Sequence, residues 1–152
     1  MPQPRYPGKL HHHIPSWVQS GALFHLRIRC LPSSPPLTSP DIAPKLMASA
    51  QLYHQKNSWY ARLFLLMPDH LHAILAFPTE TGMSAVIAAW KAFHAKHNGI
   101  HWQEGYFDHR LRSDDEVTLK AHYSRMNPVV KKLCECPEDW PWVSEPFKSD
   151  PP

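Results

Sequence analysis

The chemically most suggestive stretch of the chain is LMPDHLHAIL, residues 66–75, an apolar run that holds two histidines two positions apart. In a β-strand the side chains at positions i and i+2 point to the same face, so His70 and His72 would lie side by side. Neutral imidazoles placed together offer two nitrogen lone pairs to one divalent cation, and they leave coordination positions for other ligands and a substrate oxygen. The simpler alternative is that each imidazole is buried and hydrogen-bonded to a backbone carbonyl.

A second group of reactive side chains lies in HYSRMNP, residues 122–128. Tyr123 and Asn127 are four positions apart, so on a helix they would share one face. A tyrosine hydroxyl can act as a nucleophile, and the side-chain carbonyl of asparagine is a hard oxygen ligand suited to Mg²⁺ or Mn²⁺. The alternative is structural: Tyr123 packs against the core, and Asn127 caps the helix end before Pro128.

The elements that would position these residues follow from the hydrophobic pattern. Residues 22–30 alternate in period two, which predicts a strand, and apolar positions recur at helical spacing over residues 41–57. Residues 61–77 are apolar on both faces, as in a central strand covered on each side. Pro68 interrupts this run, so two shorter strands or a bulge are expected there.

The second half of the chain carries two helix patterns. Ser84 is expected to cap a helix that ends at Gly99, and an aromatic and charged stretch that forms a loop or short strand follows. Acidic residues after Ser113 predict the start of another helix, which Pro128 should end or kink. The proline-rich residues 137–152 are expected to be irregular.

The order of these elements predicts an α+β fold, with helices packed against an antiparallel sheet. The expected organisation is an extended N-terminal arm over residues 1–21, one domain over residues 22–143 and a C-terminal tail over residues 144–152. The histidine triplet His11–His13 is interpreted as surface, because three adjacent side chains cannot all face one ion.

Composition sets broad limits on the function. The chain has 152 residues and is 43% hydrophobic, which suits a single globular domain with a real core. Its formal charge of +3, with twelve histidines, favours an anionic partner without identifying it. Three cysteines, no secretory signal and no apolar run of about 18 residues indicate a cytoplasmic protein without disulfides or membrane spans.

Three blocks of the sequence, in the same order, resemble a known family. LMPDHLHAIL is similar to the "MPNHxHxLL" signature of the single-tyrosine, His-hydrophobic-His (HUH) transposases of insertion sequences, and WQEGYFDHRLR resembles their following block. YSRMNPVVKKL resembles their Y-x-x-x-N-P-V segment, and the closing PEDWPW is also similar. The branch that the chain resembles most is that of the REP-associated tyrosine transposases. Asp69 stands where asparagine is common, and Ser124 stands where an aliphatic residue is usual.

The resemblance implies a ferredoxin-like sheet and a metal-dependent nuclease and strand transferase that acts on single-stranded DNA at hairpin-forming or inverted repeats. Tyr123 would be the nucleophile that forms a 5′-phosphotyrosine link, and His70, His72 and Asn127 would hold Mg²⁺ or Mn²⁺. Such a protein would act as a monomer or homodimer. Two alternatives stay open: a catalytically silent DNA-binding protein with the same fold, and a metal-dependent hydrolase of small molecules in which Asp69 is a weak candidate base.

A single-stranded substrate would require cations for its phosphates and aromatic faces for its bases. The candidate DNA-binding residues are Arg110, Arg112, Lys120, Arg125, Lys131, Trp102 and Tyr106. A solvated surface explains the charged residues equally well, and core packing is the simpler explanation for the aromatic ones. The acidic residues Glu104, Asp108, Asp114 and Asp115 are not expected to take part in catalysis.

Overall fold

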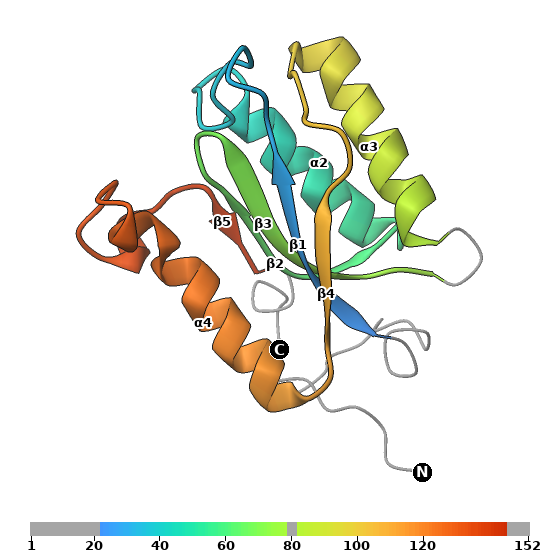
Figure 1. The fold of residues 1–152 in the computed structure, drawn as a ribbon, viewed down its shortest axis with the longest axis vertical. Helices are drawn as coiled ribbons and strands as arrows, with labels where there is room; N and C mark the ends of the chain where they lie inside the picture. Colours follow the sequence, from blue (N-terminus) through green and yellow to red (C-terminus); the bar gives the residue numbers. More distant parts are fainter. Residues whose placement is uncertain (1–21, 79–81, 146–152) are drawn as a thin grey trace.

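The computed structural model describes residues 22–78 and 82–145. In chain order (Figure 1) the elements are β1 (Leu23–Arg29), α2 (Ala43–Gln55), β2 (Tyr60–Leu66), β3 (His70–Ala76), α3 (Met83–Asn98), β4 (Phe107–Leu111), α4 (Asp114–Val130), a short 3₁₀ helix η1 (Pro137–Asp139) and β5 (Val143–Ser144). The predicted N-terminal arm and His11–His13 lie outside the described residues, as do residues 146–152 of the predicted tail.

The strands form one antiparallel sheet in the order β4-β1-β3-β2-β5. The first six elements run β-α-β-β-α-β, and their four strands lie in the order 4-1-3-2, which is the ferredoxin-like arrangement. The predicted fold class is therefore confirmed. β3 is the central strand, flanked by β1 and β2, and this explains why its sequence is apolar on both faces.

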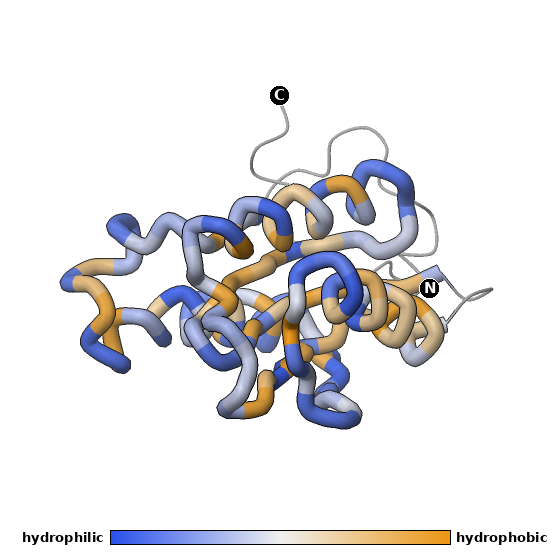
Figure 2. The backbone as a smooth tube through the Cα atoms, turned by 90° about the horizontal axis from the view of Figure 1, so that it is seen from above, coloured by the Kyte–Doolittle hydropathy of each residue, from blue (hydrophilic) through white to orange (hydrophobic). Residues whose placement is uncertain are grey.

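The two faces of the sheet are covered unequally. α2 and α3 lie on one face, where Trp59, Phe64 and Trp90 are the largest members of the main apolar core. α4 lies on the other face over a smaller apolar cluster, to which it contributes Val117 and Ala121. The hydrophobic stretches run through the middle of the molecule, between more polar outer turns (Figure 2). Part of the α4 face is therefore left for polar side chains.

Most helix boundaries follow the predicted signals, with one exception. Gly99 ends α3 in the left-handed conformation, at a φ of 66°. The Ser113 side chain caps α4 by accepting a hydrogen bond from the Glu116 backbone N–H. The prediction for Ser84 was wrong, because α3 begins two residues earlier than expected, with Gly82 as its N-cap and no side-chain cap. The Ser84 hydroxyl instead lies 3.2 Å from the Tyr106 hydroxyl.

α4 was expected to end or kink at Pro128, but it continues past this residue to Val130. A proline removes one hydrogen bond to the residue four positions earlier, and this loss is tolerated in the last turn of a helix. Backbone bonds continue past the proline, since the Lys131 N–H donates to the Asn127 carbonyl at 2.9 Å. The helix that carries Tyr123 and Asn127 is therefore continuous through both residues.

The C-terminal segment is more ordered than its proline content predicts. β5 pairs with β2 at the edge of the sheet, so Ser144, which was assigned to the tail, belongs to the sheet. The Trp140 Nε1–H donates to the Leu66 carbonyl at 2.9 Å, and the Leu66 N–H donates to the Trp142 carbonyl at 2.9 Å. These bonds fix the segment against β2. Across residues 22–78 and 82–145, no helix has the length and hydrophobicity needed to cross a membrane.

Candidate active site

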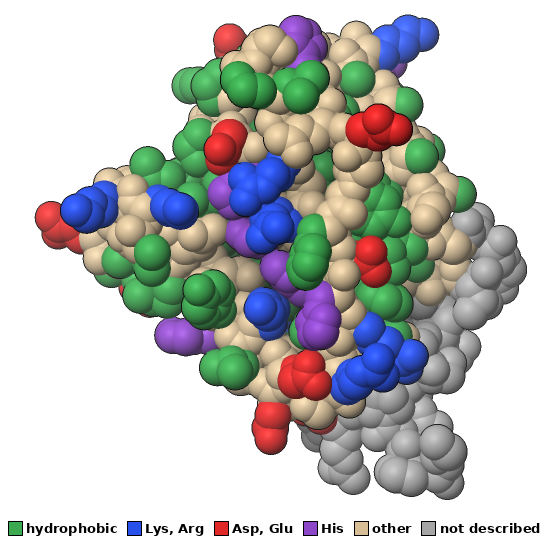
Figure 3. Space-filling view, viewed as in Figure 1, with side chains coloured by type: hydrophobic (Ala, Val, Ile, Leu, Met, Phe, Trp, Pro, Cys, Tyr) green, Lys and Arg blue, Asp and Glu red, His purple; other side chains and the backbone are tan. Residues whose placement is uncertain are grey.

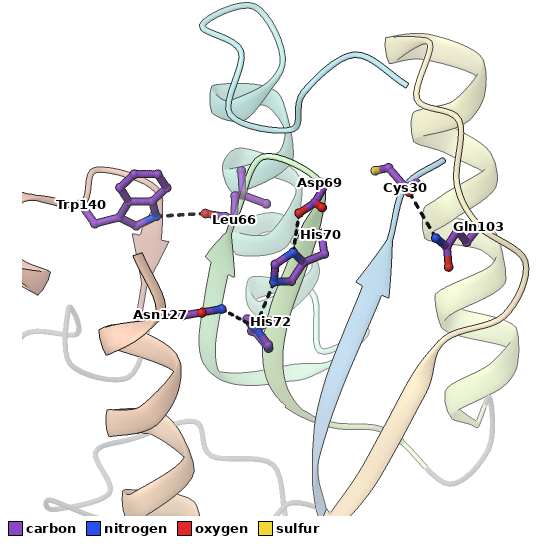
Figure 4. A network of polar contacts seen from close by, with 8 residues as sticks. All are labelled: Cys30, Leu66, Asp69, His70, His72, Gln103, Asn127 and Trp140. Carbon is purple, nitrogen blue, oxygen red and sulfur yellow. Dashed lines mark hydrogen bonds and ion pairs between the residues drawn. The ribbon is translucent and has the colours of Figure 1, made fainter. Parts of the chain in front are cut away.

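The central strand β3 brings the two histidines together on the face of the sheet that α4 covers. They pair with Arg29 and Arg27 of β1, and their side chains point to the same face. His70 Nε2 lies 3.2 Å from His72 Nε2 (Figure 4). Two nitrogen ligands at about 2.1 Å from one metal ion would be separated by about 3.0 to 3.4 Å. The observed spacing therefore fits two ligands of a single cation.

The hydrogen bonds around the pair determine which nitrogens carry lone pairs. His70 Nδ1–H donates to Asp69 Oδ1 at 2.7 Å, so its Nε2 is left as an acceptor. Asn127 Nδ2–H donates to His72 Nε2 at 2.8 Å, which makes that nitrogen an acceptor too. The two nitrogens lie 3.2 Å apart, and with these hydrogen bonds neither carries a proton. A cation that took the place of the Asn127 N–H as the partner of His72 Nε2 would be bound by both nitrogens, which supports a metal site here.

A third histidine orients the ring of His72. His72 Nδ1–H donates to His25 Nε2 at 3.1 Å, and the two rings are nearly parallel, with an interplanar angle of 18°. Metal-binding histidines commonly donate their other ring N–H to such an acceptor, which fixes the tautomer and the ring orientation. Asp69 has this role for His70, and His25 has it for His72.

Burial keeps these imidazoles in the neutral form that binds metals. Desolvation, with the nearby positive charges, lowers the pKa of His72 to about 3 and that of His25 to about 4. Burial also lowers the pKa of His70, although the Asp69 carboxylate opposes this change. The hydrogen bond from His70 in turn lowers the pKa of Asp69. Near neutral pH the ring nitrogens are therefore available without the loss of a proton.

α4 presents the other two predicted site residues to the same place. Tyr123 and Asn127 line one groove with His70 and His72, and the volume of the groove is about 590 Å³. The Tyr123 side chain is 72% exposed, so its hydroxyl is accessible to a large substrate. The structure therefore brings together all four residues that the sequence nominated for chemistry, although they come from separate elements.

The donor set fits a catalytic metal better than a structural one. No group of three or more His, Cys, Asp or Glu side chains in the described part of the chain is arranged to hold a metal. The candidate ligands are two imidazoles and one amide, whose Oδ1 is attached to the same carbon as the Nδ2 that meets His72. Three protein ligands leave positions for water and substrate oxygens, as in open catalytic sites.

Two arginines of β1 complete the groove, and the sequence reasoning missed them. Arg27 and Arg29 line both the histidine groove and a neighbouring groove of about 420 Å³ formed by residues 103–107. The Arg27 guanidinium lies 5.0 Å from the centre of the Phe107 ring. Lys, Arg and His side chains form a band down this face between α4 and β4 (Figure 3). The signal was present in the alternation of residues 22–30, which places His25 and both arginines on one face.

Three of the predicted DNA-binding residues lie along this band. Lys131 lines the histidine groove, and Tyr106 lines the neighbouring groove. The Lys120 ammonium lies 5.5 Å from the centre of the Tyr123 ring. The two lysines and the tyrosine ring are placed where a nucleic-acid strand that passes Tyr123 would meet them.

The other four predicted DNA-binding residues are not brought to the groove. Trp102 packs 5.7 Å from Trp90, centre to centre, and its Nε1–H donates to a backbone carbonyl. On β4, the two neighbours of Arg110 are His109 and Leu111, whose side chains lie on the face of the sheet that carries the histidine pair. The side chain of Arg110 therefore points to the opposite face. Arg112 is exposed just beyond β4, and Arg125 is bound to a carboxylate on the other flank of α4.

Comparisons with known proteins agree with this geometry. No protein-family model matches the chain. In an alignment of 97 positions that covers 52% of this chain, the chain is 25% identical to a Haemophilus influenzae protein named REP-associated tyrosine transposase. The match spans about half of that relative, 54% of its length. The structure of a REP-associated tyrosine transposase bound to a REP hairpin is similar over 81% of this chain and 76% of its own, with a TM-score of 0.69 at 20% identity.

The sequence likeness and the structural likeness are two different kinds of support for the resemblance first seen in three blocks of the sequence. The first rests on aligned residues over half of the chain, and the second rests on the arrangement of the sheet and helices. The resemblance to the REP-associated tyrosine transposases is therefore confirmed, and the chain has the fold of these transposases.

Proposed function

We propose that this protein is a metal-dependent endonuclease and strand transferase that cleaves and rejoins single-stranded DNA through a 5′-phosphotyrosine intermediate. The observation that carries the proposal is the convergence of two acceptor nitrogens, 3.2 Å apart, with Asn127 and Tyr123 in one accessible groove. Phosphodiester cleavage requires stabilisation of charge on the non-bridging oxygens and a nucleophile aligned with the phosphorus. The groove offers a residue for each requirement.

The roles of the residues follow from their chemistry. His70, His72 and Asn127 would hold Mg²⁺ or Mn²⁺, and the bound ion would supply positive charge to the phosphate oxygens. The Tyr123 hydroxyl gives up its proton, and its oxygen forms a bond to phosphorus as the bond from phosphorus to the 3′ oxygen breaks. The 3′ oxygen takes up a proton and leaves as a hydroxyl, and the 5′ phosphate stays on the protein. A 3′-hydroxyl can later reverse this step and join two strands, because the covalent bond conserves the phosphodiester energy.

The substrate class is inferred from the charge of the groove and from the relatives. Arg27, Arg29 and Lys131 surround the histidine pair with positive charge, which suits a chain of phosphates. The relative of known structure was bound to a REP hairpin. We therefore propose hairpin-forming repeat sequences with a flanking single strand as the substrate.

The decisive experiment follows the covalent intermediate. Wild-type protein incubated with a hairpin oligonucleotide and Mn²⁺ should give a protein–DNA adduct that survives denaturation, and Tyr123→Phe should give none while still binding the DNA. Tyr53→Phe is the matched control, because it removes a phenol from α2, on the opposite face of the sheet, and should leave the adduct unchanged. An adduct that persists in Tyr123→Phe would contradict the assignment of the nucleophile.

The same experiment distinguishes the proposed enzyme from its main alternative. A catalytically silent DNA-binding protein would bind the hairpin and yield neither adduct nor nicked strand at any Mn²⁺ concentration. Because this alternative shares the fold and the basic groove, only the chemical readout distinguishes it from the proposed enzyme.

A further inference from the structure

α4 is held against the sheet in two different ways along its length. Its N-terminal half packs through Val117 and Ala121 on the smaller apolar cluster. Its C-terminal half buries only Ser124 and Pro128, and neither belongs to an apolar cluster of the described residues. Hydrophobic packing therefore fixes the first half of the helix better than the half that carries the candidate site residues.

Besides the bond from Asn127 to His72, one carboxylate oxygen connects that second half to the edge of the sheet. Glu145 Oε1 accepts a hydrogen bond from Arg125 Nη1 of α4 at 2.8 Å and another from Arg62 Nη1 of β2 at 2.7 Å. Glu145 directly follows β5, so three elements meet at one atom. The side chain of Arg62 is 3% exposed and that of Glu145 is 15% exposed. Charge-assisted bonds so shielded from water are strong and weakly screened by salt.

The backbone of β2 is adapted to this contact. The pairing of β2 with β3 shifts register between Ala61 and Leu63, so Arg62 is the extra residue of a bulge. Ala61 packs in the core under α2 and α3, whereas Leu63 packs in the cluster under α4. Regular alternation would place these two side chains on the same face. The bulge changes the phase of the strand at Arg62, where the guanidinium meets Glu145.

We propose that Arg125 is a positioning residue: through Glu145 and Arg62, it fixes the C-terminal half of α4 so that Asn127 meets His72. The proposal rests on the proposed function, in which Asn127 is a metal ligand. Arg125 lies two residues from Asn127, on a different side of the helix, so it acts on the site only through the position of the backbone. Its guanidinium is bound to Glu145, which assigns it to the protein rather than to DNA.

The test measures Mn²⁺ affinity in the full chain, with four forms: wild type, Arg125→Ala, Asn127→Ala and the double variant. Arg125→Ala should weaken Mn²⁺ binding by about 10-fold, the scale of residues that orient a ligand. In the Asn127→Ala background, the same substitution should change the affinity by less than about twofold, because the ligand that it positions is gone.

The direction of the change in Mn²⁺ affinity distinguishes a positioning role of Arg125 from an electrostatic one. Removal of a positive charge by itself favours a bound cation, so an electrostatic role for Arg125 predicts tighter Mn²⁺ binding. Lys96→Ala, an exposed lysine of α3 on the other side of the sheet, is the matched charge control and should leave the affinity unchanged. Arg125→Lys should restore part of the affinity, since it keeps one charged donor to Glu145. Glu145 itself is not varied, because its loss would leave Arg62 buried without this carboxylate.

Hydrogen exchange provides a readout that does not depend on metal. Amides in the last two turns of α4 should exchange at least about fivefold faster in Arg125→Ala than in wild type, while amides of α3 stay unchanged. Equal Mn²⁺ losses in both backgrounds would overturn the proposal, and so would an Arg125→Ala protein with wild-type affinity and exchange. If wild type and Asn127→Ala bind Mn²⁺ equally, Asn127 is not a metal ligand. Hydrogen exchange in α4 then decides by itself whether Arg125 holds the helix.

Discussion

In the described part of the chain, an imidazole meets an asparagine in two clusters, one on each face of the sheet. Between α2 and α3, His94 Nε2–H donates to Ser49 Oγ at 3.0 Å, and Asn98 Nδ2–H donates to His94 Nδ1 at 2.7 Å. On the α4 face, Asn127 donates to His72 at a similar distance, 2.8 Å. His94 is 1% exposed, and both of its ring nitrogens have protein partners. The two clusters therefore share components but differ in what remains available to a ligand.

The difference shows what makes a histidine cluster chemically useful. The cluster around His94 is closed, since Trp90 Nε1–H also donates to the same Ser49 oxygen at 2.9 Å. In the groove, the bond to Asp69 leaves His70 Nε2 as an acceptor, 3.2 Å from the His72 Nε2 that accepts from Asn127. Burial and a hydrogen-bonded asparagine are common to both clusters. Two adjacent acceptor nitrogens in an accessible groove distinguish the second cluster from the first.

The largest expected effect comes from removal of one groove imidazole. His72→Gln should lower Mn²⁺ affinity on the order of 1,000-fold. Loss of a residue that only orients a metal ligand already lowers metal affinity by about 10- to 100-fold, and His72 is itself a proposed ligand. His94→Gln is the matched control and should bind Mn²⁺ as wild type does. Titration of Mn²⁺ by electron paramagnetic resonance or calorimetry gives both affinities. Loss of Mn²⁺ binding in folded His94→Gln would break the comparison between the clusters.

The closed cluster should instead control stability in acid. Burial lowers the pKa of His94 from 6.5 to about 4, so the unfolded chain binds a proton between these values and the folded chain does not. Stability is therefore unaffected above pH 6.5 and is lost as the pH falls toward 4. A shift of this size corresponds to up to about 3 kcal/mol of unfolding free energy.

Urea unfolding at several pH values, with a chelator present, measures this loss. His94→Gln should be less stable than wild type at pH 7 but should lose less stability between pH 6.5 and 4, because glutamine does not titrate. Parallel pH curves for the two proteins would show that His94 is not the group responsible.

A smaller effect is expected at the carboxylate that orients His70. Asp69→Asn keeps a hydrogen-bond acceptor for His70 Nδ1 but removes the negative charge, so Mn²⁺ affinity should fall by about 10-fold and not disappear. Asp108→Asn, on the exposed side of β4, removes a similar charge away from the groove and should have little effect. An unchanged affinity in Asp69→Asn would mean that the carboxylate is not needed to orient the ligand.

Local sequence patterns predicted the parts of the site that lie within one element. The spacing of His70 and His72 on a strand, and of Tyr123 and Asn127 on a helix, fixes which face each pair shares. The patterns did not show which elements become neighbours, so Arg27 and Arg29 were missed, although the alternation of residues 22–30 places both on one face of the strand. Strand order depends on the packing of the whole sheet, which no short window contains.

Sequence patterns also failed to predict the irregular features of the fold. Alternation assumes a regular strand, and the bulge at Arg62 reverses the face of the residues beyond it. Glu145 lies in a segment that proline content marked as irregular, yet β5 brings it to α4. Pro128 predicted an end or a kink of the helix because the rule applies to a helix interior, whereas this proline lies in the last turn.

The smallest expected effect compares two serines, one from each face of the sheet. The Ser124 hydroxyl is buried under α4 and has no hydrogen-bond partner among the described residues. Ser124→Ala should therefore raise the unfolding free energy by about 0.5 to 1 kcal/mol, since it removes an unpaired polar group and favours the helix. Ser49→Ala should lower it by about 1 to 2 kcal/mol, because Trp90 and His94 would lose their shared acceptor. Chemical denaturation of both variants gives the two signs, and a destabilised Ser124→Ala would show that the hydroxyl has a partner after all.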